Sequence, residues 1–294
     1  ISSDEGQQLL VDLAKHVELT GMTFHPGVSY RNIMVDRSGK HDWSALRSTP
    51  PHDIPGESVA KYLPVGGSKD KSEHTKLLLQ LISQSGRFLA DHEINRTRRE
   101  LGELPATHIW PWGQGQIPDM ASFFSRYELH GAMITAVDLL SGIAQLIGWH
   151  RLDVPGQTSY HDTDYVAAGQ HAMAALETYD LVCVHIEAPD EAAHAGDAST
   201  KVAAIEAIDE HVVGPIHAAL LARRDEYRIL YLPDHYTAVS SRKHEPDPVP
   251  FAICGTHITS VLKRPFYEAN ANASDLHVEY GHELMEYFLF SGIS

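Results

Sequence analysis

The sequence predicts an α/β fold in which a mostly parallel sheet is flanked by helices and joined to a smaller α/β domain. From about residue 123, short apolar runs alternate with amphipathic helical patterns. GAMITAV is followed by DLLSGIAQLIG, and the helical stretch DTDYVAAGQHAMAALE is followed by DLVCVHI. This alternation is typical of parallel sheets whose two faces are covered by helices. We therefore expect one domain over residues 1–122 and a second over 123–294.

The same alternation of strands and helices continues through the second domain. A long helix is predicted over about 199–223, and the strand YRILYLP follows it. The strand PVPFAIC and the helix HELMEYFLF close the chain. Helical spacing predicts that the long helix buries a stripe of apolar side chains: Val202, Ile205, Ile208, Val212, Ile216 and Leu220.

The first domain is predicted to open with a helix, because Ser2 and Glu5 have the spacing of a capping box. The stretch MTFHPGVSYRNIMVD alternates like a hairpin that turns at Pro26-Gly27. Residues 38–70 are rich in Gly, Pro, Ser and charge and are predicted to form a loop, followed by a helix over about 72–91.

Composition limits the classes of partner and compartment. The chain has 294 residues, 43% of them hydrophobic, and a formal net charge of -16. Such a charge argues against nucleic acid or an anionic membrane as a partner, since both require a basic surface. No apolar run is long enough to span a membrane. Cys183 and Cys254 each lie in an apolar run, which favours reduced thiols and a cytoplasmic location.

Three polar blocks lie where an α/β sheet would place a ligand site, at the carboxyl ends of strands. Asp190 and His194 follow DLVCVHI, Asp234 and His235 follow YRILYLP, and His244 precedes PVPFAIC. Asp and His four residues apart share one face of a helical turn and can reach one ion. Adjacent Asp and His diverge and can serve two nearby ions. Mixed carboxylate and imidazole ligands suit Zn²⁺ or Mn²⁺.

Each block alone has a simpler explanation as a surface pair. The coincidence of three blocks, each beside its own strand, is what favours a metal site. Glu187 and Glu191 lie in the same acidic stretch, HIEAPDEAAHAGD, and are interpreted as solvated or as neighbours of the ligands.

The first domain carries a different set of polar residues. Arginines bind phosphate and carboxylate groups through paired hydrogen bonds, although any one of them can simply solubilise a surface. The candidates for substrate binding are Arg31, His52, Asp53, Asn95 and Arg98, with Arg96 and Arg99 nearby.

With these residues in view, the chain resembles the archaeal-type branch of the cofactor-independent (2,3-bisphosphoglycerate-independent) phosphoglycerate mutases, in the alkaline phosphatase superfamily. The matching stretches are FHPGVSYRNIMV, TPPHDI, HEINRTRRELGELPATHIWPWGQG, VPGQTSYHDTDY, HIEAPDEAAHAGD and LPDHYTAVSSRKHEPDPVPF. They occur in family order over nearly the whole chain.

The resemblance implies an alkaline-phosphatase-like domain that holds two divalent ions (Mn²⁺, Zn²⁺, Co²⁺ or Mg²⁺), and an inserted domain, residues 1–122, that grips a small phosphorylated substrate. By resemblance, Asp190, His194 and His244 hold one ion, and Asp234 and His235 hold part of the other. The implied reaction interconverts 3-phosphoglycerate and 2-phosphoglycerate through a phosphoserine, without 2,3-bisphosphoglycerate. The alternatives are a related metal-dependent phosphatase or phosphotransferase, and a non-catalytic binding remnant.

Two departures from the family pattern qualify this expectation. The family's first strand carries another metal-binding aspartate, with a serine nucleophile after it, and both would precede Ile1. We therefore expect this chain, taken alone, to hold one nearly complete metal site and one incomplete site, and to be inactive. The family usually has a lysine where this chain has Ala168.

Overall fold

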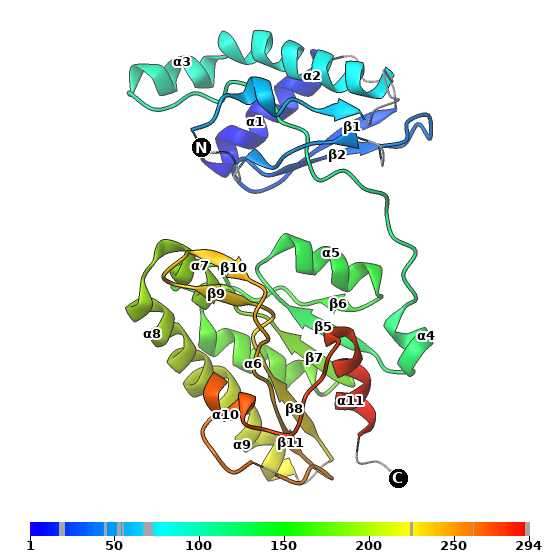
Figure 1. Ribbon diagram of the computed structural model, residues 1–294, viewed down its shortest axis with the longest axis vertical. Coiled ribbons are helices and arrows are strands. Elements are labelled where there is room, and N and C mark those ends of the chain that lie inside the picture. The colour runs from blue at the N-terminus through cyan, green and yellow to red at the C-terminus, as the bar shows by residue number, and fades with distance from the viewer. Residues whose placement is uncertain are drawn as a thin grey trace. The chain divides into compact units, whose positions relative to one another are not determined.

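The computed structural model describes residues 1–17, 21–43, 46–51, 54, 56–66, 73–223, 226–260 and 262–291. The chain divides into two compact units, Ile1–Pro118 and Asp119–Ser294 (Figure 1). The sequence placed the boundary near residue 122. Each unit is described by itself below.

Unit 1 begins with the helix α1 (Ser3–Ala14), and its capping box forms as the sequence predicts: the Ser2 hydroxyl accepts from the Glu5 backbone N–H, and the Glu5 carboxylate accepts from the Ser2 backbone N–H. The predicted hairpin is confirmed. Strands β1 (Met22–Pro26) and β2 (Asn32–Asp36) pair antiparallel, with Met22 opposite Asp36 and Pro26 opposite Asn32.

The described part of the predicted loop, residues 38–70, contains short regular elements. Strands β3 (Leu46–Arg47) and β4 (Val65–Gly66) pair antiparallel, and the 3₁₀ helix η2 (Val59–Lys61) lies between them in sequence. The helices α2 (Glu73–Ala90) and α3 (Glu93–Glu100) complete the unit. Two-residue strands are too short to show a period in the sequence, which explains why the pattern did not reveal them.

The core of unit 1 forms between α1, α2 and β3. It contains the buried side chains of Leu10, Leu13, Val17, Leu46, Leu78 and Leu81. The apolar faces of the two helices supply most of this cluster.

Unit 2 contains a parallel sheet with strand order β6-β5-β7 (Figure 1). Its strands are β5 (Gly131–Ile134), β6 (His150–Arg151) and β7 (Leu181–Val184). The short helix α4 (Phe123–Tyr127) precedes β5, and the helices α5 (Asp138–Leu146) and α6 (Tyr165–Ala175) pack against it. The α/β class with a parallel sheet flanked by helices is confirmed.

The chain leaves β7 through α7 (Ala188–Ala195) and then enters a long helical stretch: α8 (Ala198–Ile208), the π-helical turn η3 (Asp209–Val213) and α9 (Gly214–Arg223). Helix is confirmed over 199–223, but the predicted buried stripe is wrong in its first half. Val202 is 54% exposed and Ile205 is 42% exposed, whereas Ala204 and Val212 are buried. A π turn has more residues than an α turn, so the buried positions on either side of η3 fall out of one register.

The last strands pair antiparallel. Strand β8 (Arg228–Tyr231) pairs with β11 (Ala252–Gly255), and β9 (Tyr236–Ala238) forms a hairpin with β10 (Lys243–Glu245). No crossover helix separates β8 from β11, so the chain returns in the opposite direction. The elements α10 (Glu268–Asn272), η4 (Gly281–Glu283) and α11 (Leu284–Phe290) follow. Cys183 and Cys254 are free thiols, as expected.

Replacing a core leucine of unit 1 tests this packing. Leu13 is 1% exposed, so Leu13→Ala leaves a cavity and should lower the free energy of unfolding by about 2–5 kcal/mol. Leu104, which is 87% exposed, provides the matched control, and Leu104→Ala should change stability by less than about 0.5 kcal/mol. Urea denaturation measures both, and equal effects would contradict the proposed core.

Candidate metal centre

The first part of the site lies on α7. Pro189 occupies the first turn of this helix, where the missing backbone N–H carries no penalty. The helical spacing brings the side chains of Asp190 and His194 together, with 3.2 Å between Asp190 Oδ2 and His194 Nε2. His194 Nδ1 lies 2.9 Å from the carbonyl oxygen of Arg242. A carbonyl can only accept, so Nδ1 carries the hydrogen and the Nε2 lone pair is presented to a ligand.

The second part comes from the chain that follows β8. His235 directly precedes β9, and His244 lies in the middle of β10, opposite Thr237. His244 Nε2 lies 3.5 Å from Asp190 Oδ1 and 3.1 Å from His194 Nε2. The ring centroids of His235 and His244 are 3.9 Å apart. The sequence placed His244 before a strand; in the structure the hairpin itself carries it.

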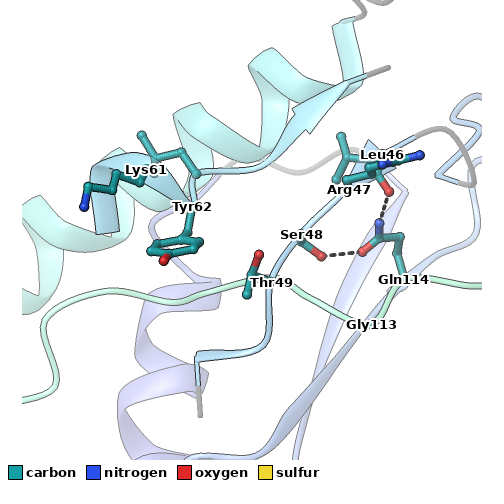
Figure 2. A pocket seen from close by; sticks show the side chains of 9 residues that line it. Leu46, Arg47, Ser48, Thr49, Lys61, Tyr62, Gly113 and Gln114 are labelled. Atoms are coloured by element: carbon teal, nitrogen blue, oxygen red, sulfur yellow. Dashed lines mark hydrogen bonds between the residues drawn. The ribbon is translucent and has the colours of Figure 1, made fainter. Parts of the chain in front are cut away.

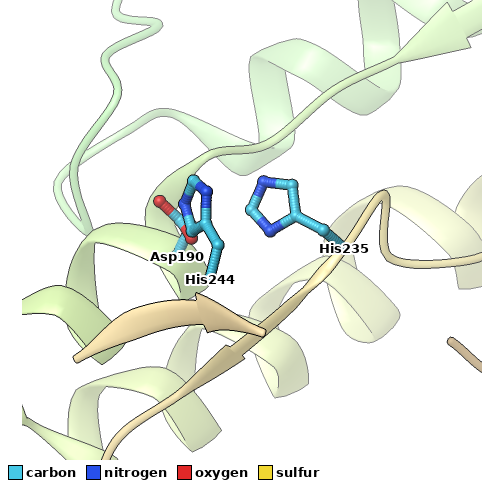
Figure 3. A group of neighbouring side chains, drawn as sticks. All are labelled: Asp190, His235 and His244. Carbon is cyan, nitrogen blue, oxygen red and sulfur yellow. The ribbon is translucent and has the colours of Figure 1, made fainter. Parts of the chain in front are cut away.

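These residues form one cluster. One ligand atom from each of Asp190, His235 and His244 lies within 4.8 Å of the others, and Figure 3 shows the three side chains facing one another. His194 contacts both Asp190 and His244. A carboxylate and imidazole nitrogens at these separations fit a Zn²⁺ or Mn²⁺ ion. The resemblance divided these residues between two ions; the structure brings His235 within reach of the first set.

Asp234 stands slightly apart. Its Oδ1 accepts the backbone N–H of His235 at 3.0 Å, its Oδ2 lies 3.5 Å from His235 Nε2, and its side chain is 62% exposed. It is not among the three residues that share one centre, and its assignment to a second ion stays a prediction.

The sequence did not identify Thr237, whose side chain is buried in the cluster. Its hydroxyl donates to Asp190 Oδ1 at 2.6 Å and lies 3.1 Å from His235 Nδ1. Since a hydroxyl has one hydrogen, its oxygen accepts from His235 Nδ1–H, and this leaves the His235 Nε2 lone pair for a ligand. The available signal was the two-residue period of a strand, which places Thr237 on the same side as His235.

An acidic residue beside the cluster experiences an unfavourable electrostatic environment. Burial, together with the negative charges of Asp190 and Asp234, raises the pKa of Glu187 to about 7. Glu187 Oε2 lies 3.4 Å from His185 Nε2, and burial lowers the pKa of His185. The structure places Glu187 partly inside the fold and close enough to Asp190 to feel its charge. Of the two interpretations from the sequence, a neighbour of the ligands fits this position and a fully solvated residue does not. A bound cation would relieve this accumulation of carboxylates.

The predicted substrate residues lie in unit 1, and they differ in the contacts that their side chains make. Asn95 is fully buried; its amide donates to the carbonyls of Leu89 and Ala106. Arg98 forms ion pairs with Glu5 and Glu103. Arg31 is exposed at the β1–β2 hairpin. His52 and Asp53 lie outside the described residues. The substrate role of all five stays a prediction.

Ala168, where the resemblance expects a lysine, is fully buried on α6. It packs in a cluster with Ile134, Val154 and Ala172. A lysine side chain at this position would have to displace that cluster or extend out of it.

The fold and this cluster define a metalloenzyme, and a model of the metalloenzyme superfamily matches residues 50–282. A model of the 2,3-bisphosphoglycerate-independent phosphoglycerate mutases matches residues 1–95. The chain belongs to this family of phosphoglycerate mutases, as the sequence resemblance indicated.

Curated relatives carry the same family name. Phosphoglycerate mutase 2 of Methanothermobacter thermautotrophicus is 44% identical over 94% of this chain and 67% of its own length. The mutase of Methanothrix thermoacetophila is 41% identical over 97% of this chain and 70% of its own length. A probable mutase of Geobacter sulfurreducens is 40% identical over 98% of this chain and 70% of its own length. The chain thus spans about two thirds of the length of these relatives.

Two solved structures share the fold. A Pyrococcus horikoshii protein matches with a TM-score of 0.72 at 22% identity, over 92% of this chain and 64% of that protein. A cofactor-independent phosphoglycerate mutase of Thermoplasma acidophilum matches with a TM-score of 0.61 at 19% identity, over 96% of this chain and 68% of that one. Within the described residues, no helix is both long and apolar enough to cross a membrane.

Removing the central carboxylate should weaken metal binding. Asp190→Asn should raise the dissociation constant for Mn²⁺ or Zn²⁺ by at least about tenfold, because the neutral amide is a poorer ligand. Isothermal titration calorimetry of the chelator-treated protein measures this dissociation constant. Glu191→Gln removes the same charge from the next position of α7 and is expected to have a much smaller effect. Equal effects would show that overall charge, not ligation by Asp190, determines affinity.

The raised pKa of Glu187 predicts a pH dependence of stability. Between its ordinary pKa of 4.5 and its folded value of about 7, the folded state retains the proton and the unfolded state loses it. Stability therefore falls as pH rises through this window. Glu187→Gln removes this loss, so above pH 7 the variant should melt at a higher temperature than the parent when both are metal-free. Thermal melts in chelator check this, with the exposed Glu210→Gln as control; an unchanged pH profile would contradict it.

Proposed function

We propose that the protein interconverts 3-phosphoglycerate and 2-phosphoglycerate by metal-assisted phosphoryl transfer, without 2,3-bisphosphoglycerate. The observation that supports this most is the convergence of Asp190, His194, His235 and His244, in a chain whose relatives at 40–44% identity are named phosphoglycerate mutases. The substrate would be a small phosphorylated acid, and a cytoplasmic site of action forms part of the same proposal.

The residues of unit 2 would hold two divalent ions (Mn²⁺, Zn²⁺, Co²⁺ or Mg²⁺). Asp190, His194 and His244 are assigned to one, and Asp234 and His235 to part of the other. Such ions, when bound, neutralise charge on the oxygens of a transferring phosphoryl group. The contacts around His235 and His244 allow the two sites to be close neighbours.

The remaining residues would orient these ligands and handle the substrate. The Thr237 hydroxyl fixes Asp190 and the tautomer of His235, so neither ligand has to reorganise when an ion enters. Unit 1 would hold the glycerate while it reorients and would exclude water, because water would convert the mutase into a phosphatase. Arg31, His52, Asp53, Asn95 and Arg98 are the predicted contacts.

The reaction is best tested on the protein in its full encoded length, because we assign the phosphoryl-accepting serine to no residue of this chain. We expect isomerisation of 3-phosphoglycerate without added 2,3-bisphosphoglycerate, loss of activity in chelator and recovery with Mn²⁺. Asp190→Asn should lower kcat by at least about 10²–10³-fold, the usual effect of losing a group that stabilises the transition state. Glu191→Gln should retain most of the activity.

Two results would select the other candidates. Release of inorganic phosphate that exceeds isomerisation would identify a phosphatase. Tight Mn²⁺ binding without turnover of phosphoglycerate would identify a non-catalytic binding protein. A coupled enolase assay and a phosphate assay, run on the same samples, separate these outcomes.

A further inference from the structure

One residue of the β9–β10 hairpin has a backbone conformation that its residue type disfavours. Arg242 closes the turn between the two strands, and its backbone N–H donates to the carbonyl oxygen of Ala238 at 2.8 Å. Its φ of 57° lies in the left-handed region, where a β-carbon is crowded and glycine is the usual residue. Another residue type keeps such a conformation only where its surroundings hold it there. The contacts of Arg242 should therefore account for this conformation.

The carbonyl group of Arg242 contacts a predicted metal ligand. His194 Nδ1 donates its hydrogen to this oxygen at 2.9 Å. The other polar contacts that the described residues make with the His194 ring involve Nε2, which lies 3.2 Å from Asp190 Oδ2 and 3.1 Å from His244 Nε2. Nε2 is the atom that faces an ion. The hydrogen bond to Arg242 is therefore the contact that can stay in place when the site is filled.

Packing alone does not fix the ring of His194. Its side chain is 37% exposed, and it lies in the last turn of α7. An exposed imidazole can rotate or change its tautomer, and either change would turn a hydrogen toward Asp190 in place of a lone pair. The Arg242 carbonyl disfavours both changes, because a carbonyl accepts only from a ring nitrogen that carries hydrogen.

The guanidinium group of Arg242 contacts the same end of α7. A β-carbon built on Gly196 would lie 2.6 Å from Arg242 Nε and 2.7 Å from Nη2, so the guanidinium group fills the space beside this glycine. Gly196 is the C-cap of α7, where a positive charge is favourable because of the helix dipole. Arg242 thus meets the end of α7 twice, through its carbonyl at His194 and through its guanidinium group at Gly196.

Other contacts keep the hairpin in place beside the helices. Helix α7 packs against β9, as Figure 1 shows. Lys201 on α8 donates through Nζ to the carbonyl oxygen of Thr237 at 2.7 Å. Within the hairpin, the Ser241 hydroxyl donates to the Glu245 carboxylate. The turn that carries Arg242 is therefore fixed on both sides, and its carbonyl oxygen is presented to His194 in a defined direction.

We propose that Arg242 is a positioning residue of the metal centre. Its left-handed backbone, held by the guanidinium contact with Gly196, directs a carbonyl oxygen at His194 and so presents the His194 Nε2 lone pair to the ion. This inference rests on the proposed function and gives a role to a residue that the sequence did not single out. If Arg242 were a turn residue only, glycine would be the better residue at this position.

Two substitutions separate the side chain of Arg242 from its backbone conformation. Arg242→Gly removes the guanidinium group and leaves the left-handed conformation accessible. Arg242→Val also disfavours that conformation, because a β-branched residue rarely adopts it. In metal-free, mildly alkaline solution, ¹⁵N NMR should show hydrogen on Nδ1 of His194 in the parent. Arg242→Gly should give a mixture of tautomers and Arg242→Val chiefly the Nε2–H form. The His194 signals are assigned by their loss in His194→Gln.

The same variants should bind metal more weakly. Isothermal titration calorimetry with Mn²⁺ should give a dissociation constant raised at least about tenfold in Arg242→Gly and further in Arg242→Val, the usual effect of losing a group that orients a ligand. Lys243→Gln removes a positive charge from the adjacent exposed position and should bind as the parent does.

A second control separates positioning from backbone strain. Glu128 is exposed and has a φ of 56°, so Glu128→Val introduces the same strain outside the cluster. This variant should lower the melting temperature, as Arg242→Val does, and leave both the His194 tautomer and Mn²⁺ binding at the parent values. A purely structural role of Arg242 would make the two valine variants equal in all three measurements.

Two outcomes would overturn the role of Arg242. One is a parent-like His194 tautomer in both Arg242 variants; the other is an Arg242→Gly variant that is more stable than the parent and binds Mn²⁺ equally well. The proposed function can fail separately. A parent protein that binds no Mn²⁺ overturns the proposed metal centre, while the NMR comparison still decides whether Arg242 orients His194. Weakened Mn²⁺ binding in the Arg242 variants, without isomerisation by the full-length parent, overturns the proposed reaction alone.

Discussion

In the cluster of Asp190, His194, His235 and His244, the ligand arrangement depends on the hydrogen bond from the Thr237 hydroxyl to the Asp190 carboxylate. This bond links the helix that follows β7 to the hairpin that follows β8, across 47 residues of sequence. The bond fixes the position of one Asp190 carboxylate oxygen. Because the hydroxyl gives its only hydrogen to Asp190, its oxygen must accept from His235 Nδ1–H, and this fixes the tautomer of His235. His194 and His244 then meet the same carboxylate from two further directions. The contacts of His194 with the Arg242 carbonyl and of His244 with Asp190 join the same two segments.

Convergence of these segments also concentrates negative charge. The negative charges of Asp190 and Asp234 act on Glu187 where the chain leaves two strands. This repulsion contributes to the raised pKa of Glu187. A fold selected only for stability would gain from neutral residues here, because carboxylates near one another and partly buried are unfavourable without a cation. Local unfavourable electrostatics of this kind is expected where a protein binds a positive ion. Unit 1 shows the opposite arrangement, with Arg47 and Lys61 at a cavity in an acidic chain (Figure 2).

Much of the fold followed from local patterns, and the exceptions have two causes. The α1 capping box and the β1–β2 hairpin were predicted, because spacing within a turn or a hairpin specifies them. The parallel sheet was predicted from the alternation of strands and helices, which does not say that β5 pairs with β7. The exposed Val202 and Ile205 were not predicted, because the π turn η3 breaks the helical register. The antiparallel return of β11 and the two-residue strand β3 were missed as well, since pairing direction and very short strands leave no period in the sequence.

The sequence by itself determined the class of fold, the family, and which residue types could bind a metal: Asp190, His194, Asp234, His235 and His244. Pairs close in sequence, such as Asp190 and His194, were also predicted to meet, because one helical turn brings them together. Only the tertiary structure decided that His235 joins Asp190 and His244, that Thr237 orients two of them, and that Arg47 and Lys61 flank one cavity. The physical reason is that these contacts join segments separated by many residues. Their geometry is set by strand pairing and packing, which the spacing of residues in a sequence does not encode.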